Sequence, residues 1–166
     1  MQCRRSRRSN RATLPLTSPR GHRSAAPSSY LAGGSIEKGP VVLYFQPAAF
    51  TTGCTIKAHD FADATDTYRA LGATVIAVSH DNIDPLNKFS VSECRSKFAV
   101  AADADQSIMK SYDAVLAIKP EYADRVSYVI APDEHIVYAY QSLNPEKHVA
   151  NTLDALRKWA AAQRKH

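Results

Sequence analysis

The sequence has few cysteines and lacks long apolar runs. Its 166 residues include three cysteines, Cys3, Cys54 and Cys94, and no Cys-x-x-Cys pair. This spacing excludes a disulfide scaffold and argues against a disulfide reductase with two neighbouring thiols. No apolar run approaches the roughly 18 residues that cross a bilayer, and the six histidines have no zinc-ligand spacing. We therefore expect no membrane segment, metal or other cofactor.

The basic charge of the chain is concentrated at its start. The formal net charge is +5, with 21 basic and 16 acidic residues. Residues 1–35 contain seven of the basic residues, all arginine, and no acidic residue, which leaves 14 basic residues against the 16 acidic ones. The rest of the chain is therefore slightly acidic, and we expect it to have no nucleic-acid partner.

Residues 1–38 are rich in Arg, Ser, Pro and Ala and show no clear hydrophobic period. This composition predicts a basic, disordered segment, followed by one domain over residues 39–166. The segment is consistent with an organelle transit peptide, with a basic arm that binds acidic surfaces, or with a divergent or misassigned N-terminus. It lacks the continuous apolar region of a secretory signal.

The pattern of apolar residues beyond residue 38 predicts alternating strands and helices. Strands are expected at residues 41–45, 73–79, 98–101, 125–130 and 135–140. Helices are expected at residues 54–72, 84–97, 103–112 and from residue 144 onward, with Ile56 and Val91 as core contacts and Asp84 and Asn144 as caps. The order of elements predicts an α/β fold with a central mixed sheet and helices on both faces.

Cys54 falls in a strand-loop-helix unit, in the first turn of the expected helix. Unpaired N–H groups and the helix dipole favour an anion at that position. A thiol with an unperturbed pKa of about 8.5 is most easily ionised there. Cys54 is therefore a candidate nucleophile, although a lone cysteine after a strand is more often a small buried apolar residue.

Two motifs carry a resemblance to a known family. The pattern Pro47-x-x-x-Thr51-x-x-Cys54 resembles the active-site signature of the peroxiredoxins, the AhpC/TSA superfamily, and Arg125-Val126-Ser127-Tyr128 resembles the strand with their active-site arginine. Gly53-Cys54-Thr55 is similar to the bacterioferritin-comigratory (Q-type) subgroup. The resemblance covers about residues 39–160 and implies a thioredoxin-like fold.

The resemblance implies a thiol-dependent peroxidase that reduces hydrogen peroxide and organic hydroperoxides through a sulfenic acid on Cys54. It implies that Arg125 stabilises the thiolate and the negative charge that develops on the separating oxygens. It also implies that Thr51 orients the peroxide and that Pro47 shields the thiolate from water. The residues alone leave other roles open. Arg125 is also consistent with a solvated strand flank, and Thr51 with a helix cap.

The resemblance also bears on how the sulfenic acid is resolved. Many Q-type members have the resolving cysteine five residues after the peroxidatic one, where this chain has His59. The segment around Cys94 resembles members that have the resolving thiol there, which implies a Cys54–Cys94 disulfide. The alternative is a one-cysteine mechanism with an external thiol. Lys57 stands where the subgroup commonly has Glu, and its effect on the thiol stays open.

The implied partners are a peroxide substrate and thioredoxin or a similar dithiol reductant, with the protein a monomer or weak homodimer. We expect a cytoplasmic location, or an organelle if the Arg/Ser-rich start is a targeting segment. A second hypothesis is a thioredoxin-fold holdase or redox-sensing binding protein without peroxidase turnover. A third is an interaction protein that binds through the basic arm.

Overall fold

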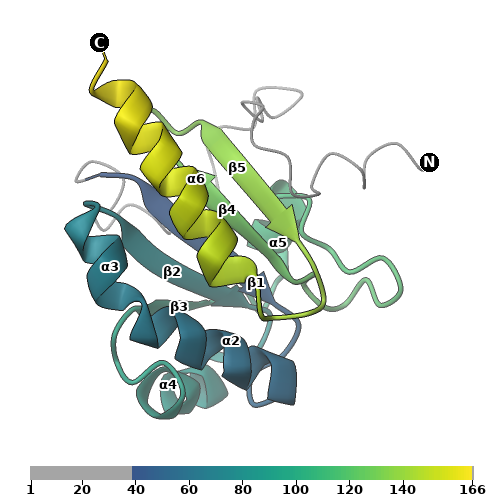
Figure 1. Ribbon diagram of the computed structural model, residues 1–166. Coiled ribbons are helices and arrows are strands. Elements are labelled where there is room, and N and C mark those ends of the chain that lie inside the picture. Colours follow the sequence, from purple (N-terminus) through teal and green to yellow (C-terminus); the bar gives the residue numbers. More distant parts are fainter. Residues whose placement is uncertain (1–38, 166) are drawn as a thin grey trace.

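The fold is built on a five-stranded mixed sheet, and the computed structural model describes residues 39–165. The strands are β1 (Val41–Gln46), β2 (Thr74–Ser79), β3 (Ala99–Ala102), β4 (Val126–Ile130) and β5 (Ile136–Gln141). Their order across the sheet is β3-β2-β1-β4-β5 (Figure 1). The pairs β1–β2 and β2–β3 are parallel, and β1–β4 and β4–β5 are antiparallel. The predictions for residues 1–38 lie outside the described residues.

The central strand β1 is buried along its whole length. Because side chains alternate across a strand, Leu43 and Phe45 belong to one hydrophobic cluster, and Val42 and Tyr44 belong to another on the opposite face. A strand covered on both faces is expected to be a continuous apolar run. This burial explains why the sequence signal was clearest here.

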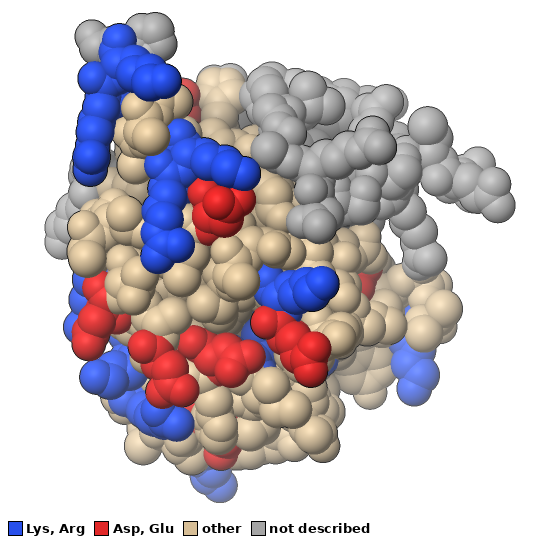
Figure 2. All heavy atoms as spheres, viewed as in Figure 1, with Lys and Arg blue, Asp and Glu red and all other residues tan. Residues whose placement is uncertain are grey.

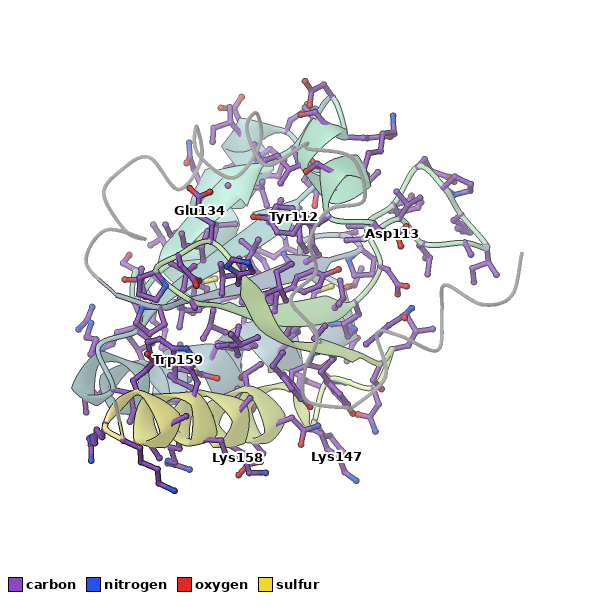
Figure 3. All side chains as sticks on the ribbon, turned by 90° about the horizontal axis from the view of Figure 1, so that it is seen from above. Tyr112, Asp113, Glu134, Lys147, Lys158 and Trp159 are labelled. Carbon is purple, nitrogen blue, oxygen red and sulfur yellow. The ribbon has the colours of Figure 1, made fainter. Side chains whose placement is uncertain are left out.

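Helices cover both faces of the sheet, as predicted. They are α2 (Thr52–Asp63), α3 (Thr65–Ala70), α4 (Ile83–Ser92), α5 (Ser107–Ser111) and α6 (His148–Gln163). Side chains from α2, α3, α4 and α6 pack on the face of Tyr44, and those of α5 pack on the face of Phe45. Figure 3 shows Trp159 of α6 and Tyr112, which follows α5, on opposite sides of the sheet.

The single helix predicted over residues 54–72 is wrong in detail, because it is divided at Ala64 into α2 and α3. Ile56, predicted to be a core contact, is 42% exposed. The interruption at Ala64 turns the chain, so one helical period does not hold across it. Gly72 closes the unit with φ +74°, which confirms the left-handed cap.

The other three helices also have boundaries that differ from the prediction, and α5 begins at Ser107, four residues after its predicted start. α4 begins after Asn82 and ends at Ser92, five residues before the predicted end, and Val91 is 67% exposed rather than in the core. Arg95 and Ser96 have φ values of +52° and +53°, which cannot continue a right-handed helix. Cys94 therefore lies in a turn after α4.

The final helix α6 starts at His148, later than the predicted cap at Asn144. Asn144 instead accepts a hydrogen bond from the backbone N–H of Glu146 at 3.0 Å. This local turn delays the helix because a short polar side chain can satisfy nearby backbone groups in a non-helical arrangement.

Candidate active site

Cys54 lies in the first turn of α2, which a short loop joins to the end of β1. It is the third residue of α2, and its side chain is fully buried. The first-turn N–H groups of a helix have no intrahelical partner, so they favour negative charge on a nearby sulfur. The prediction that Cys54 lies in the first turn of a helix is confirmed.

Arg125 lies directly before β4 and reaches the same place from the neighbouring strand. Its Nη2 donates to Cys54 Sγ at 3.5 Å, and its Nη1 donates to Gly53 O at 2.9 Å. The contact follows from the sheet register, because Phe45 at the end of β1 pairs with Val126. Arg125 is only 5% exposed, so the alternative of a solvated strand flank is wrong.

Asp124 fixes the backbone from which Arg125 extends. Its Oδ1 accepts the backbone N–H of Arg125 at 2.8 Å, and its Oδ2 accepts a hydrogen bond from Gln141 Nε2 on β5. Asp124 is 2% exposed. A buried carboxylate with several donors is a rigid support, so Asp124 restricts the backbone from which the Arg125 side chain extends.

Thr51 and Pro47 lie in the loop that joins β1 to α2. Thr51 occupies the N-cap position with extended backbone, but its hydroxyl donates to Ala48 O at 3.0 Å and makes no cap hydrogen bond. The alternative role of Thr51 as a side-chain helix cap is therefore wrong. Pro47 follows β1 directly and is half-buried. The structure thus brings Cys54 and Arg125 into contact and positions Thr51 and Pro47 in the adjoining loop.

Asp81 holds this loop, and the sequence analysis missed it. Its Oδ2 accepts the backbone N–H of Ala49 at 2.8 Å and the hydroxyl of Ser79 at 2.5 Å. Phe50, the next residue after Ala49, has φ +59°, a conformation that needs support from its surroundings. The signal was available, because the carboxyl ends of the parallel strands β1 and β2 meet at one edge.

Lys57 is buried in the interior, one helical turn after Cys54. It is 0% exposed. Its Nζ donates to Phe45 O at 3.3 Å and lies 4.6 Å from the centre of the Tyr44 ring. Burial lowers the pKa of Lys57 well below its usual range, and the charge of Arg125 lowers it further. Its position was predicted, but its complete burial was not.

Cys94 is also a free, fully buried thiol, and it belongs to the same hydrophobic cluster as Cys54 and Tyr44. Burial raises the pKa of Cys94 to about 12, and the carboxylate of Glu93 also raises it. Burial raises the pKa of the Tyr44 hydroxyl well above its usual range, and both cysteines raise it further. Cys94 is therefore protonated at neutral pH in this conformation.

Two polar contacts hold the Cys94 segment against α2. His59 Nε2 lies 2.8 Å from Glu93 Oε2, and Arg95 Nη1 lies 2.5 Å from Asp63 Oδ1. They come from the residues on either side of Cys94. His59, in the place where many Q-type members have a cysteine, here contacts the neighbour of the other thiol.

The described residues 39–165 contain no group of three or more His, Cys, Asp or Glu side chains arranged to hold a metal ion. None of their helices is both long enough and apolar enough to span a membrane.

Comparisons with known proteins agree on one family. The AhpC/TSA family model matches residues 30–139. Peroxiredoxin Q, chloroplastic, of Triticum aestivum is 32% identical over 119 residues, covering 71% of this chain and 54% of that protein. Peroxiredoxin Bcp of Bacillus subtilis (strain 168) is 27% identical over 123 residues, covering 70% of this chain and 77% of that protein.

Comparison with solved structures identifies a protein of the same kind. The crystal structure of peroxidoxin BcpB from Mycobacterium tuberculosis superposes with a TM-score of 0.70 at 27% identity, covering 76% of this chain and 84% of that one. The likeness confirms the predicted thioredoxin-like fold. The chain spans about half the length of the plant relatives it matches.

Proposed function

The chain belongs to the AhpC/TSA family, and on that premise we propose that it is a thiol-dependent peroxidase with Cys54 as the peroxidatic residue. Its substrates are hydrogen peroxide and organic hydroperoxides. The observation that carries the proposal is the 3.5 Å contact from Arg125 Nη2 to Cys54 Sγ at the first turn of α2. A fixed cation and a helix N-terminus then act on the same sulfur.

The reaction uses the thiolate of Cys54. The sulfur attacks one peroxide oxygen, an S–O bond forms, and the O–O bond breaks. The other oxygen leaves with the electron pair as hydroxide or alkoxide and takes up a proton, so Cys54 becomes a sulfenic acid. Donors already in place stabilise the charge that develops on the separating oxygens. Arg125 supplies a permanent cation for this purpose.

Thr51 and Pro47 complete the proposed site from the loop. Thr51 is exposed, and its hydroxyl donates to Ala48 O. The hydroxyl oxygen can still accept a hydrogen bond from a peroxide that approaches the sulfur. Pro47 has no backbone N–H, and its half-buried ring limits the access of water to the thiolate.

The sulfenic acid is resolved by Cys94 in this proposal. The Cys94 thiol attacks the Cys54 sulfur, an S–S bond forms, and water leaves. A disulfide requires Cα atoms within about 7 Å and suitable side-chain directions. The segment after α4 must therefore move, breaking the contacts of Glu93 and Arg95 with α2. Exposure also brings the raised pKa of Cys94 back toward its usual value.

Reduction of that disulfide by thioredoxin or a similar dithiol returns the enzyme to its starting state. The alternative, a one-cysteine mechanism, leaves Cys94 unreacted and uses an external thiol. The monomer or weak homodimer stays a prediction. A cytoplasmic location also stays a prediction, and the plant relatives named as chloroplastic support the alternative of an organelle.

The surface charge supports the expectation that the described part of the chain does not bind nucleic acid. Figure 2 shows acidic side chains across the middle of one face with basic side chains around them, so this face has no continuous basic patch. Partial burial raises the pKa of Asp60, and the carboxylates of Asp63 and Glu146 raise it further. Carboxylates this close together repel a phosphate backbone.

The test is the intact mass of the reduced protein after one equivalent of hydrogen peroxide, under non-reducing conditions. Wild type should lose two hydrogen atoms as the Cys54–Cys94 disulfide forms. Cys94→Ser should gain one oxygen on Cys54, and Cys54→Ser is the control that should not react. An unreacted Cys54 thiol in all samples contradicts the proposal, and absent steady-state peroxide consumption would then favour the holdase or sensor hypothesis.

A further inference from the structure

Lys57 lies in an environment that does not stabilise a permanent positive charge. Its side chain is 0% exposed, and its Nζ has one carbonyl acceptor, Phe45 O, and the face of the Tyr44 ring. No carboxylate of the described residues forms an ion pair with it. A buried ammonium usually needs an anionic partner, and the nearby anion that can form is the thiolate of Cys54 on the preceding turn.

The other ionisable groups around Lys57 keep a fixed charge state. His148 on α6 has both ring nitrogens in hydrogen bonds, Nδ1 with the Ser127 hydroxyl at 2.9 Å and Nε2 with Ser142 O at 3.0 Å, which a neutral ring satisfies with Nε2 as the donor. Burial, with a contribution from Lys57, lowers the pKa of His148 to about 2. Burial raises the pKa of Tyr44 well above its usual range, so Tyr44 is neutral too.

Arg125 and Asp124 supply one positive and one negative formal charge, which sum to zero, although Arg125 acts on Lys57 more strongly than Asp124 does. With a Cys54 thiol and a neutral Lys57 amine, the buried cluster has no net charge. With a thiolate and an ammonium, it again has none. The mixed state of thiol with ammonium leaves the buried ammonium without an anion on the preceding turn, which is costly. The mixed state of thiolate with amine leaves the thiolate with Arg125 but without the second cation that Lys57 can supply. A change of charge on one of these two groups therefore favours the opposite change on the other.

We propose that Lys57 takes up the proton that Cys54 releases when its thiolate forms. The Cys54 S–H bond breaks, its electron pair stays on sulfur, and an N–H bond forms at Lys57 Nζ. No electron leaves the pair. When the sulfur becomes a neutral sulfenic acid, Lys57 gives up the proton again, and this proton matches the one that the departing hydroxide or alkoxide requires.

In this role Lys57 acts on the reaction through Cys54, because its positive charge compensates that of the thiolate. The proposal rests on Cys54 being the reacting thiol of the proposed function. It also gives a physical meaning to a lysine where the subgroup commonly has Glu. A glutamate there would add a negative charge beside the thiolate. The Lys57 amine instead becomes positively charged when the thiolate forms. The electrostatic influence of Cys54, which raises the pKa of Lys57, has the sign that this exchange needs.

The test measures Cys54 alone, in a Cys3→Ser/Cys94→Ser background. The thiolate absorbance near 240 nm and the rate of alkylation by iodoacetamide are followed from pH 4 to pH 10. Replacing Lys57 by Met keeps the length of the side chain and removes the amine. We expect Lys57→Met to alkylate about tenfold more slowly at pH 7 and to move the pH profile upward by about one unit. The control Lys88→Met changes an exposed lysine on α4 and should match the background.

A purely structural role predicts a different result. Lys57→Met would then change thermal stability but leave the pH profile unchanged, and that outcome overturns the proposal. A second measurement does not depend on this variant. The ¹⁵Nζ resonance of Lys57 should report an ammonium when Cys54 is a thiolate and an amine at the same pH in Cys54→Ser. An identical charge state in both proteins would contradict proton exchange.

Neither measurement involves peroxide. The proton exchange between Cys54 and Lys57 and the peroxidase function can therefore be contradicted independently of each other. If Lys57→Met moves the profile but wild type does not consume peroxide, the proton exchange holds and the peroxidase function is wrong. If wild type consumes peroxide and the profiles coincide, the function holds and the role of Lys57 is wrong.

Discussion

The two thiols of the described chain are equally buried and differ in the charges around them. Cys54 and Cys94 are both 0% exposed and share one hydrophobic cluster. Cys54 receives a hydrogen bond from Arg125 at a helix N-terminus. Cys94 lies beyond the end of α4 beside Glu93, and burial with that carboxylate raises its pKa to about 12. Burial alone therefore does not distinguish a reactive thiol from an unreactive one.

In the proposed mechanism, this difference suits the two sulfurs to successive steps. A sulfur that already contacts a cation at a helix N-terminus is in place to attack a peroxide directly. Cys94 is neutral, and its neighbours Glu93 and Arg95 contact α2, so it can react only after this segment moves away from α2. The same chain can then oxidise Cys54 without exposing Cys94 to peroxide. Each of the following variants removes one part of this contrast.

The largest effect is expected from removing the cation beside Cys54. Arg125→Met should lower the second-order rate constant for peroxide about 10²–10³-fold, because a preorganised donor to the developing charge is lost. Stopped-flow peroxide consumption measures it. Arg95→Met, which removes an exposed arginine near the other thiol, is the control and should stay within about threefold of wild type. Equal losses in both variants would contradict the special role of Arg125.

A smaller loss is expected from moving the same cation without removing it. A Cβ on Gly53 would lie 2.8 Å from Arg125 Nη2, so Gly53→Ala must displace the guanidinium. We expect about a tenfold lower rate with little change in unfolding free energy, because the tip of a long side chain can shift. In the double variant Gly53→Ala/Arg125→Met, the alanine should cost nothing further. If the losses in rate from the two substitutions were fully additive, the alanine at position 53 would act by a route other than displacing Arg125.

The contrast can also be weakened from the side of Cys94. Glu93→Gln removes the anion that raises the pKa of Cys94, and it weakens the contact with His59. Disulfide formation after oxidation should become several-fold faster, while the first oxidation of Cys54 stays unchanged. Quenched-flow mass spectrometry separates the two steps. Exposed Glu146→Gln is the control, and a slower second step in Glu93→Gln would contradict the holding role of these contacts.

The smallest effect is on stability in alkaline solution. The pKa of Cys94 is raised in the folded state above its ordinary value of 9.0, so the unfolded chain loses this proton first. Its contribution to stability is complete below about pH 9 and is lost as the pH rises toward about 12. Urea unfolding of reduced protein should show a shallower loss of stability in Cys94→Ala over this range. Identical slopes would contradict the raised pKa.

The sequence predicted the sheet well because its strands are strong local signals. β1 is an uninterrupted apolar run, and β4 and β5 are separated by a short polar turn. Helix ends were less predictable, since the positive φ values of Arg95 and Ser96 and the interruption at Ala64 depend on tertiary packing. The turn at Arg95 and Ser96 leaves Cys94 outside the helix in which it was expected, and the interruption at Ala64 divides the helix predicted over residues 54–72.

The candidate site was predictable where a motif named its residues. The contact of Cys54 with Arg125 joins positions 71 residues apart, and only the resemblance to a family indicated it. Asp81 and Asp124 were missed because their roles depend on hydrogen bonds to backbone and amide groups, which single-residue patterns do not record. Lys57 was noticed as an unusual residue, but its burial follows from which side of α2 faces the sheet.

Competition between the two thiols for a limiting alkylating agent tests the contrast most directly. Reduced native protein is treated at pH 7 with substoichiometric iodoacetamide, and peptide mass spectrometry compares modification of Cys54 with that of Cys94. We predict at least a hundredfold preference for Cys54 that disappears in denaturant, because the preference comes from folded surroundings. Equal modification of the two native thiols would contradict the view that charges around Cys54 make it the reacting cysteine.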